Sequence, residues 1–158
     1  MPNWCQNVLT IENMDPEFMD IIREKGFSFK VFVPIDETNS TESQLDDAVY
    51  HWGTKWDVDN GEHLAEELLQ GRDVSFETAW SPPVDFLNRL FERFPNMSIT
   101  LRYLEEGMGF CGWAGVDNGT FVDRCIDYSE DPEGYVKFIQ DNFDPDFVID
   151  EQGDDLHA

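Results

Sequence analysis

The chain of 158 residues has few cysteines, few cations and no long apolar run. Its three cysteines, Cys5, Cys111 and Cys125, are an odd number without CxxC spacing, so we expect reduced core thiols and no disulfide framework. No apolar run is long enough to cross a bilayer, and the start of the chain lacks the basic and apolar regions of a signal peptide. These absences predict a cytoplasmic protein.

Catalytic and metal-binding motifs are also lacking. The three histidines share no zinc-ligand spacing with one another or with the cysteines. Ser81 does not lie in a Gly-x-Ser-x-Gly turn, and no glycine-rich loop could hold a phosphate. The adjacent acids Glu105 and Glu106 could raise one another's pKa, but carboxylates are so frequent here that adjacency alone indicates nothing. We therefore expect no enzyme, no cofactor and no metal site.

What the chain has in excess is negative charge. Thirty-four Asp and Glu against ten Lys and Arg give a net charge of −24. Such a chain repels a nucleic acid backbone and an anionic membrane. Three partners remain: a basic protein surface, multivalent cations, or the bulk salt of a halophile. Thirteen Phe and five Trp supply a hydrophobic core, and this aromatic content argues against adaptation to high salt as the reason for the charge.

The clearest local pattern is a strand followed by a helix. Val74, Phe76, Thr78 and Trp80 alternate with polar or small residues, which predicts a strand over 74–80 with one apolar face. A helix is then predicted, with Ser81 as its N-cap, Pro82 at its first position, and an apolar stripe formed by Leu87, Leu90, Phe91 and Phe94.

Similar patterns predict the remaining elements. The predicted strands cover residues 5–12, 27–33, 98–105, 110–117 and 121–128, the last two joined at Asn118-Gly119, and residues 51–58 are predicted as a turn entering a strand. The predicted helices cover residues 16–25, a segment ending near Tyr50, residues 62–70, and a segment starting at Pro132. This order predicts an α+β fold: a ferredoxin-like βαββαβ sandwich, an antiparallel sheet with helices on one face, plus an extra hairpin and a C-terminal helix. We expect one domain over residues 1–143 and an acidic tail over 144–158.

A tryptophan cluster is the first candidate site. Trp52, Trp56 and Trp80 lie in two segments, and the polar residues among them are Lys55, Asp57 and Glu77. If the two segments are neighbouring strands, the indoles could flank a shallow ligand pocket. The more common role of such indoles is to fill the core, with their N–H groups bonded to the backbone.

Acidic residues near the end of the chain are the second candidate site. They are Asp127, Glu130, Asp131, Glu133, Asp141, Asp144, Asp146, Asp150 and Glu151. Phosphates along duplex DNA carry similarly close negative charges, about one per 1.7 Å. A rigid element bearing these carboxylates could therefore occupy a basic DNA-binding groove. The alternative is a solvated acidic face without a partner.

Four stretches of the sequence carry a family resemblance. They are Met1-Pro-Asn-Trp-Cys-Gln-Asn7, Trp52-Gly-Thr-Lys-Trp-Asp57, Glu77-Thr-Ala-Trp-Ser-Pro-Pro83 and Tyr103-Leu-Glu-Glu-Gly-Met-Gly-Phe110. Together they resemble the YubB-type ferredoxin-like proteins of phages and plasmids, over about Met1 to Gly119. The segment Asn60 to Arg72 is longer than expected for that family, and the acidic end is less typical. The resemblance implies a ferredoxin-like fold and a mobile-element origin, and it implies no enzyme activity.

Mobile-element origin and acidity together suggest a function. Phages commonly encode small acidic proteins that block host restriction or CRISPR complexes, which present basic grooves for nucleic acid. We expect an inhibitor that imitates nucleic acid and binds such a groove in the host cytoplasm. The alternative is a small-ligand-binding module that uses the tryptophans, and an enzyme with an unrecognised site comes third. The sequence is also compatible with a homodimer formed through an exposed edge or face of the sheet.

Overall fold

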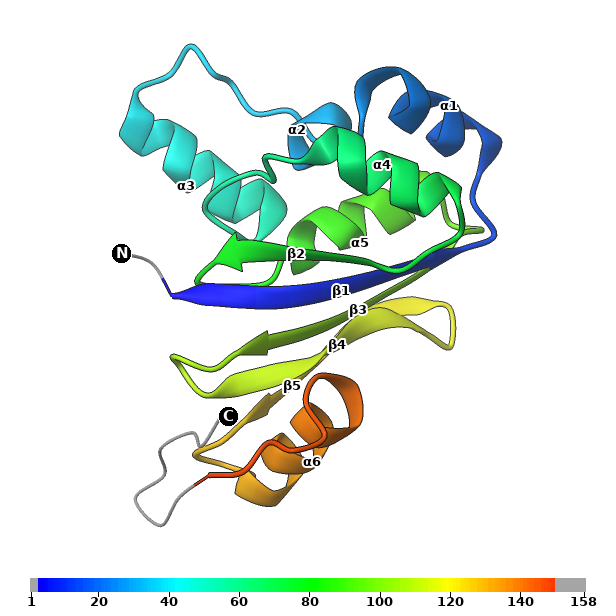
Figure 1. The fold of residues 1–158 in the computed structure, drawn as a ribbon. Helices are drawn as coiled ribbons and strands as arrows, with labels where there is room; N and C mark the ends of the chain where they lie inside the picture. Colours follow the sequence, from blue (N-terminus) through cyan, green and yellow to red (C-terminus); the bar gives the residue numbers. More distant parts are fainter. Residues whose placement is uncertain (1–2, 150–158) are drawn as a thin grey trace.

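A computed structural model describes residues 3–149 of the chain. Its described part forms one five-stranded antiparallel sheet, in the order β2-β1-β3-β4-β5, and six helices (Figure 1). The strands are β1 (Trp4–Glu12), β2 (Val74–Ala79), β3 (Ser98–Glu105), β4 (Phe110–Asp117) and β5 (Thr120–Asp127). The helices are α1 (Pro16–Lys25), α2 (Phe29–Phe32), α3 (Thr41–Trp52), α4 (Gly61–Leu69), α5 (Val84–Arg93) and α6 (Pro132–Asn142). The predicted α+β class with an antiparallel sheet is confirmed.

One face of the sheet carries the main core. In β1, Leu9 pairs with Val74 of β2 and with Leu101 of β3, and all three are buried. Helices α1 to α5 lie over this face (Figure 1). Their phenylalanines pack edge to face or tilted against one another, as between Phe29 and Phe86 at 4.7 Å between ring centroids. Large aromatic side chains therefore hold the helical layer on the sheet.

The opposite face carries a second, smaller core. Leu104 of β3 and Cys111 of β4 are paired neighbours, and they pack with Tyr135, Ile139 and Phe147. Helix α6 supplies two of these side chains and lies beside β5 (Figure 1). The expectation of helices on one face thus holds for α1 to α5, and α6 is the exception. Among the described residues, no helix covers the β1–β2 part of this second face.

The strand predicted over residues 27–33 is wrong. Residues Phe29–Phe32 form the single helical turn α2, and the N–H of Val33 donates to the carbonyl of Phe29 at 2.8 Å. The Asp57 carboxylate caps this turn, accepting from the N–H of Phe29 at 2.7 Å and of Lys30 at 3.0 Å. The alternating apolar residues fill the core from a helical turn, because a distant side chain satisfies its first N–H groups.

The strand predicted over residues 51–58 is also wrong. Helix α3 continues to Trp52 and ends at Gly53, whose φ of 83° is in the left-handed region that glycine favours. The loop that follows is tied to β2 by side chains. The Thr54 hydroxyl donates to the carbonyl of Ala79 at 3.0 Å, and the Ser81 hydroxyl donates to the carbonyl of Gly53 at 2.6 Å.

The predicted start of the next helix needs correction. Helix α5 begins at Val84 after Pro83, so Ser81 is not its N-cap and Pro82 is not its first residue. Strand β2 ends one residue before Trp80, which has a φ of 69°. The N–H of Ser81 donates to the carbonyl of Ala79 at 2.9 Å across this residue, as in a γ-turn with positive φ. Trp80 therefore leaves the strand that it was predicted to complete.

Local signals predicted the other turns well. Helix α1 has Asp15 as its N-cap, whose carboxylate accepts from the N–H of Glu17, and it ends at Gly26. Asn118 and Gly119 have φ values of 53° and 79° and join β4 to β5. Both features follow from residue types whose backbone preferences are strong.

The folded part continues beyond the predicted domain boundary at residue 143. Phe147 is buried, its ring lies 6.0 Å from that of Tyr135, and its carbonyl accepts from the Gln140 amide at 2.9 Å. The predicted acidic tail therefore starts inside the second core.

All three cysteines are free, as predicted, but only two belong to a core. Cys5 and Cys111 are buried, whereas Cys125 is exposed on β5. Burial raises the pKa of the Cys5 and Cys111 thiols to about 12, so both stay protonated and poorly nucleophilic near neutral pH. Within residues 3–149, no helix has the length and apolarity needed to span a membrane.

Candidate functional site

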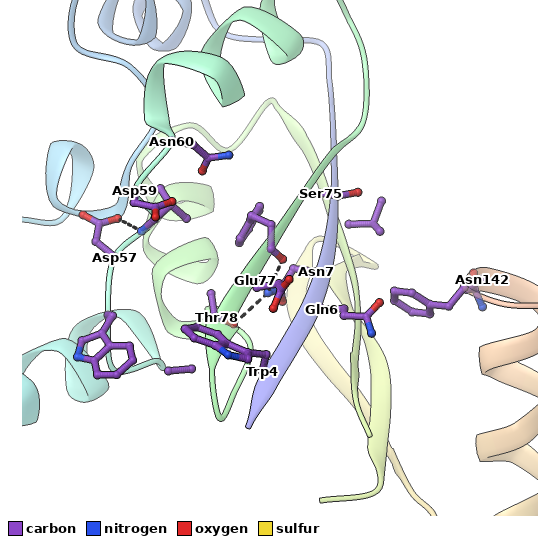
Figure 2. Close-up of a pocket in the computed structure, with 16 residues that line it drawn as sticks. Trp4, Gln6, Asn7, Asp57, Asp59, Asn60, Ser75, Glu77, Thr78 and Asn142 are labelled. Atoms are coloured by element: carbon purple, nitrogen blue, oxygen red, sulfur yellow. Dashed lines mark hydrogen bonds between the residues drawn. The ribbon is translucent and has the colours of Figure 1, made fainter. Parts of the chain in front are cut away.

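A groove of about 890 Å³ crosses the uncovered part of the second face. Its floor is formed by β1 and β2, with Gln6, Val8 and Glu77 among the lining residues (Figure 2). One wall is the segment 56–60, and the other is the end of α6 at Asn142 and Phe143. Its volume lies within the range of small-molecule sites.

The groove follows the edge of the sheet. Five consecutive residues of β2, numbers 75–79, line it. Because alternate side chains of a strand point to opposite faces, contact with all five means that the groove reaches the strand backbone. Strand β2 is the last in the sheet order, so in the described structure its outer edge has no strand partner.

Two tryptophans stand at one end of the groove. The rings of Trp4 and Trp56 lie 6.2 Å apart, and the side chains are 45% and 42% exposed. The Lys55 ammonium lies over the Trp56 ring, 5.0 Å from its centroid. Half-exposed paired indoles of this kind offer a large apolar contact area with polar rims.

The predicted tryptophan cluster is only partly assembled. Trp56, Asp57 and Glu77 line the groove, whereas Trp52, Lys55 and Trp80 do not. Trp52 is 4% exposed and its indole N–H donates to the carbonyl of Val33 at 2.8 Å, so this indole fills the core. Trp80 is 41% exposed and turns away at the γ-turn, because β2 has ended.

Trp4 is one of the groove residues that sequence reasoning missed. It lies opposite Ala79 in the β1–β2 pair, beside the loop that carries Trp56. Its signal was the alternation of β1, in which Trp4 falls on the side of Gln6 and Val8, opposite the buried Cys5 and Leu9. A large indole on the polar face of a strand therefore indicates a candidate binding surface.

The groove is acidic. Its lining includes the carboxylates of Asp57, Asp59 and Glu77 and contains neither Lys nor Arg. Asp57 is occupied by its three N–H donors, from Phe29, Lys30 and Val58. Asp59 and Glu77 are exposed, and they are the carboxylates that could meet a cationic ligand.

The predicted acidic residues surround α6. Seven of them lie in the described part of the chain, whereas Asp150 and Glu151 lie outside it. Three have local structural roles: Asp127 accepts from the N–H and hydroxyl of Ser129, Asp131 caps α6 by accepting from the N–H of Gly134, and Asp144 accepts from the N–H of Asp146. The bonds from Ser129 lower the pKa of Asp127 below its usual range.

Few cations balance this acidic surface. Lys137 pairs with Asp141 at 3.0 Å on α6, and Arg124 pairs with Asp117 at 2.6 Å on the neighbouring hairpin. Glu130, Glu133 and Asp146 take part in none of the ion pairs found among residues 3–149. The surface around α6 therefore stays strongly negative.

A polar cluster inside the sheet is the remaining group of titratable residues. The Tyr103 hydroxyl donates to Asp123 at 2.5 Å, and Glu105 is fully buried at the end of β3. Burial raises the pKa of both the Tyr103 hydroxyl and the Glu105 carboxyl. In the described part of the chain, no three or more His, Cys, Asp or Glu side chains are arranged to hold a metal ion.

A family model matches residues 51–142, which is more than half of the chain, and it describes a ferredoxin-like domain in Api92-like proteins. No curated protein and no solved structure matches the chain. The match agrees with the antiparallel sheet and helices described above, and it carries no YubB name. The chain therefore belongs to the family of ferredoxin-like domains found in Api92-like proteins.

Proposed function

We propose that this protein, a YubB-type phage or plasmid product, binds the basic nucleic-acid groove of a host CRISPR or restriction complex and blocks it. The observation that supports this proposal is the unbalanced acidic surface around α6. Glu130, Glu133 and Asp146 have no cation partner among the described ion pairs, on a chain with a net charge of −24. A basic groove gains favourable charge contacts from such a surface, as it does from phosphates.

Rigidity of the acidic surface adds to this argument. Helix α6 is held to the sheet by buried Tyr135 and Ile139, and Phe147 fixes the segment after it. Carboxylates on a fixed scaffold lose little conformational freedom when they bind. An imitation of nucleic acid needs this preorganisation, because a flexible acidic tail would offer charge without fixed spacing.

Capture from host lysate tests the proposal. Tagged protein is incubated at roughly 50 and 200 mM salt, because charge contacts to a basic groove weaken steeply over this range. We expect a nuclease or restriction complex to be retained at the lower salt and released by duplex DNA. An empty capture, or one insensitive to both salt and DNA, would contradict mimicry.

Charge reversal supplies the matched control for this capture. The double variant Glu130→Lys with Glu133→Lys should lose the complex. Glu24→Lys with Glu62→Lys changes the net charge equally on exposed positions of α1 and α4, across the sheet, and should retain it. Equal loss in both double variants would mean that net charge alone acts, without a specific surface.

The groove beside Trp4 and Trp56 favours a second candidate function, a ligand-binding module. Its support is the paired half-exposed indoles over a groove of about 890 Å³. This function predicts that ligand binding is weakened by Trp56→Ala and is unchanged by the charge reversals Glu130→Lys and Glu133→Lys. Neither candidate function includes catalysis.

A further inference from the structure

We propose that the groove along β2 takes an extended peptide segment bearing arginine or lysine, which adds to the sheet as a further strand. This inference rests on the second candidate function, the ligand-binding module, and not on the acidic surface around α6. It names the class of ligand: a basic polypeptide in an extended conformation.

The free edge of β2 supplies the main-chain part of the site. The groove contacts residues 75–79 in succession, a run of roughly 17 Å at about 3.4 Å per residue. An outer strand presents unpaired N–H and C=O groups, and proteins usually protect such edges with lysine, proline or a bulge. Strand β2, Val-Ser-Phe-Glu-Thr-Ala, contains neither Lys nor Pro. The Ala79 carbonyl already accepts from the Thr54 hydroxyl and the Ser81 N–H, so the edge over residues 75–78 is the part that offers hydrogen bonds to an added strand.

Charge selects the kind of peptide. Glu77 projects from the β2 floor and Asp59 from the wall, both exposed, and no Lys or Arg lines the groove. An acidic peptide or a nucleic acid would meet these carboxylates without compensation. A basic side chain alternating along the added strand would lie against them, with opposite charges attracting across neighbouring strands.

Two indoles supply a place for a cationic side chain. The Lys55 ammonium lies over the Trp56 ring, 5.0 Å from its centroid, so a ligand cation would displace it from this ring or stack on the ring of Trp4. Trp4, 6.2 Å away, adds a second ring at the same end of the groove. Arginine suits such a position best, because its planar guanidinium stacks on aromatic faces and pairs with carboxylates.

A second copy of this chain fits the groove poorly. A symmetric β2–β2 pairing would bring the carboxylates Glu77 and Asp59 of one copy towards those of the other. Like charges opposite one another destabilise a strand pair. The charge of the groove thus favours a basic partner over self-association.

Binding of a defined peptide tests the inference. The probe is a fluorescein-labelled octapeptide of alternating Arg and Val, titrated with the full chain at roughly 150 mM salt and followed by anisotropy. We expect saturable binding, and none for the peptide with Glu in place of Arg. Two N-methylated forms each block alternate N–H groups; strand addition predicts that one form loses binding and the other keeps it.

Variants place the peptide on the molecule. Trp56→Ala and Glu77→Lys should each weaken binding by roughly tenfold, from the lost cation–π contact and the reversed charge. Glu77→Gln is a milder second variant if the reversal disturbs folding. The double variant Glu130→Lys with Glu133→Lys should change the affinity by less than about threefold, because neither residue lines the groove.

Each contrary outcome overturns the inference in a distinguishable way. Equal binding by both N-methylated peptides excludes strand addition. If arginine amide binds as tightly as the octapeptide and loses the same affinity in Trp56→Ala, the groove is a small-ligand site and not a peptide site. Loss of binding only in the double variant Glu130→Lys with Glu133→Lys would show that the peptide binds the acidic surface around α6. A dimer of this chain that dissociates in Glu77→Lys would show that a second copy occupies the groove.

Discussion

Glu105, at the end of β3, is a carboxyl side chain without exposed surface. Its Oε1 atom accepts from the N–H of Met108 at 3.2 Å, and its Oε2 atom has no hydrogen-bond partner in the described structure. Burial raises the pKa of this carboxyl above its ordinary value of 4.5. The folded state therefore favours the protonated form, and the resulting stability is complete below pH 4.5 and is lost as the pH rises through the folded pKa.

Glu105→Gln should consequently stabilise the protein at neutral pH. The amide keeps an acceptor for Met108 and removes a buried charge, which we expect to add on the order of 1 kcal/mol to the free energy of unfolding at pH 7. The difference from the natural chain should shrink towards pH 4. Urea unfolding across this pH range measures it, with Glu12→Gln at the exposed end of β1 as the control. A Gln variant that is less stable at pH 7 would contradict the assignment.

Asp57 and Asp59 are neighbouring carboxylates with different expected roles. Asp57 accepts from three backbone N–H groups at 2.7 to 3.0 Å, so Asp57→Ala should lower the free energy of unfolding by about 1–2 kcal/mol. Asp59→Ala, on the exposed wall of the groove, should leave stability nearly unchanged and weaken the binding of the basic peptide. Denaturant unfolding of both variants checks this, and equal losses of stability would show that the capping role is wrong.

At the residue scale, sequence reasoning found the groove only in part. Trp56, Asp57 and Glu77 were identified, because polar residues between tryptophans are visible in any single chain. For Trp52 the core alternative holds, with its indole N–H bonded to the backbone, and Trp4 was missed. Whether an indole is buried depends on the chain that packs against it: the carbonyl of Val33 for Trp52, and the ring of Trp56 for Trp4.

At the scale of elements, β4 packs closely against both neighbouring strands at Gly112. A Cβ atom at Gly112 would lie against the carbonyl oxygen of Arg124 and 2.7 Å from the Tyr103 hydroxyl. Gly112→Ala should therefore push β3 and β5 away and cost about 2–3 kcal/mol of unfolding free energy. The control is Gly115→Ala in the same strand, whose Cβ would meet the carbonyl of Ile99 at 3.0 Å, and it should cost less. Thermal unfolding compares the two, and equal melting temperatures would contradict the close approach.

Elements with strong local signals were predicted, and those fixed by distant contacts were not. Helix α1 and the β4–β5 turn follow from their caps and from Asn118-Gly119. The turn α2 was mistaken for a strand because its cap, Asp57, is 28 residues from Phe29 in the sequence. The alternation of Phe27, Phe29 and Val31 is the same in both conformations, so periodicity could not decide between them.

At the scale of the whole molecule, the sheet order makes the first fifty residues indispensable. Strand β1 lies between β2 and β3, and it falls outside the matched segment 51–142. That segment alone would leave β2 without a strand neighbour and one edge of β3 unpaired.

We therefore expect residues 51–142 alone to show no cooperative unfolding, whereas residues 1–149 should unfold in a single transition. Circular dichroism during thermal unfolding and the dispersion of amide NMR signals test this expectation. A well-dispersed spectrum from the shorter segment would contradict the role given to β1.

The overall charge was evident from composition, but its placement was not. Sequence alone could not show that α6 packs on the face opposite the other helices, because that depends on Leu104 and Cys111 pairing across β3 and β4. This placement puts the acidic surface around α6 beside the groove over β1 and β2, because Asn142 at the end of α6 forms part of the groove wall.

Competition for the captured host complex tests the central claim most directly. The affinity of that complex for this protein is measured at increasing concentrations of its duplex DNA. If the acidic surface imitates nucleic acid, the two ligands exclude one another, and the apparent dissociation constant rises linearly with the DNA concentration. If the complex binds both at once with unchanged affinity, the protein does not occupy the nucleic-acid groove, and the mimicry proposal is wrong.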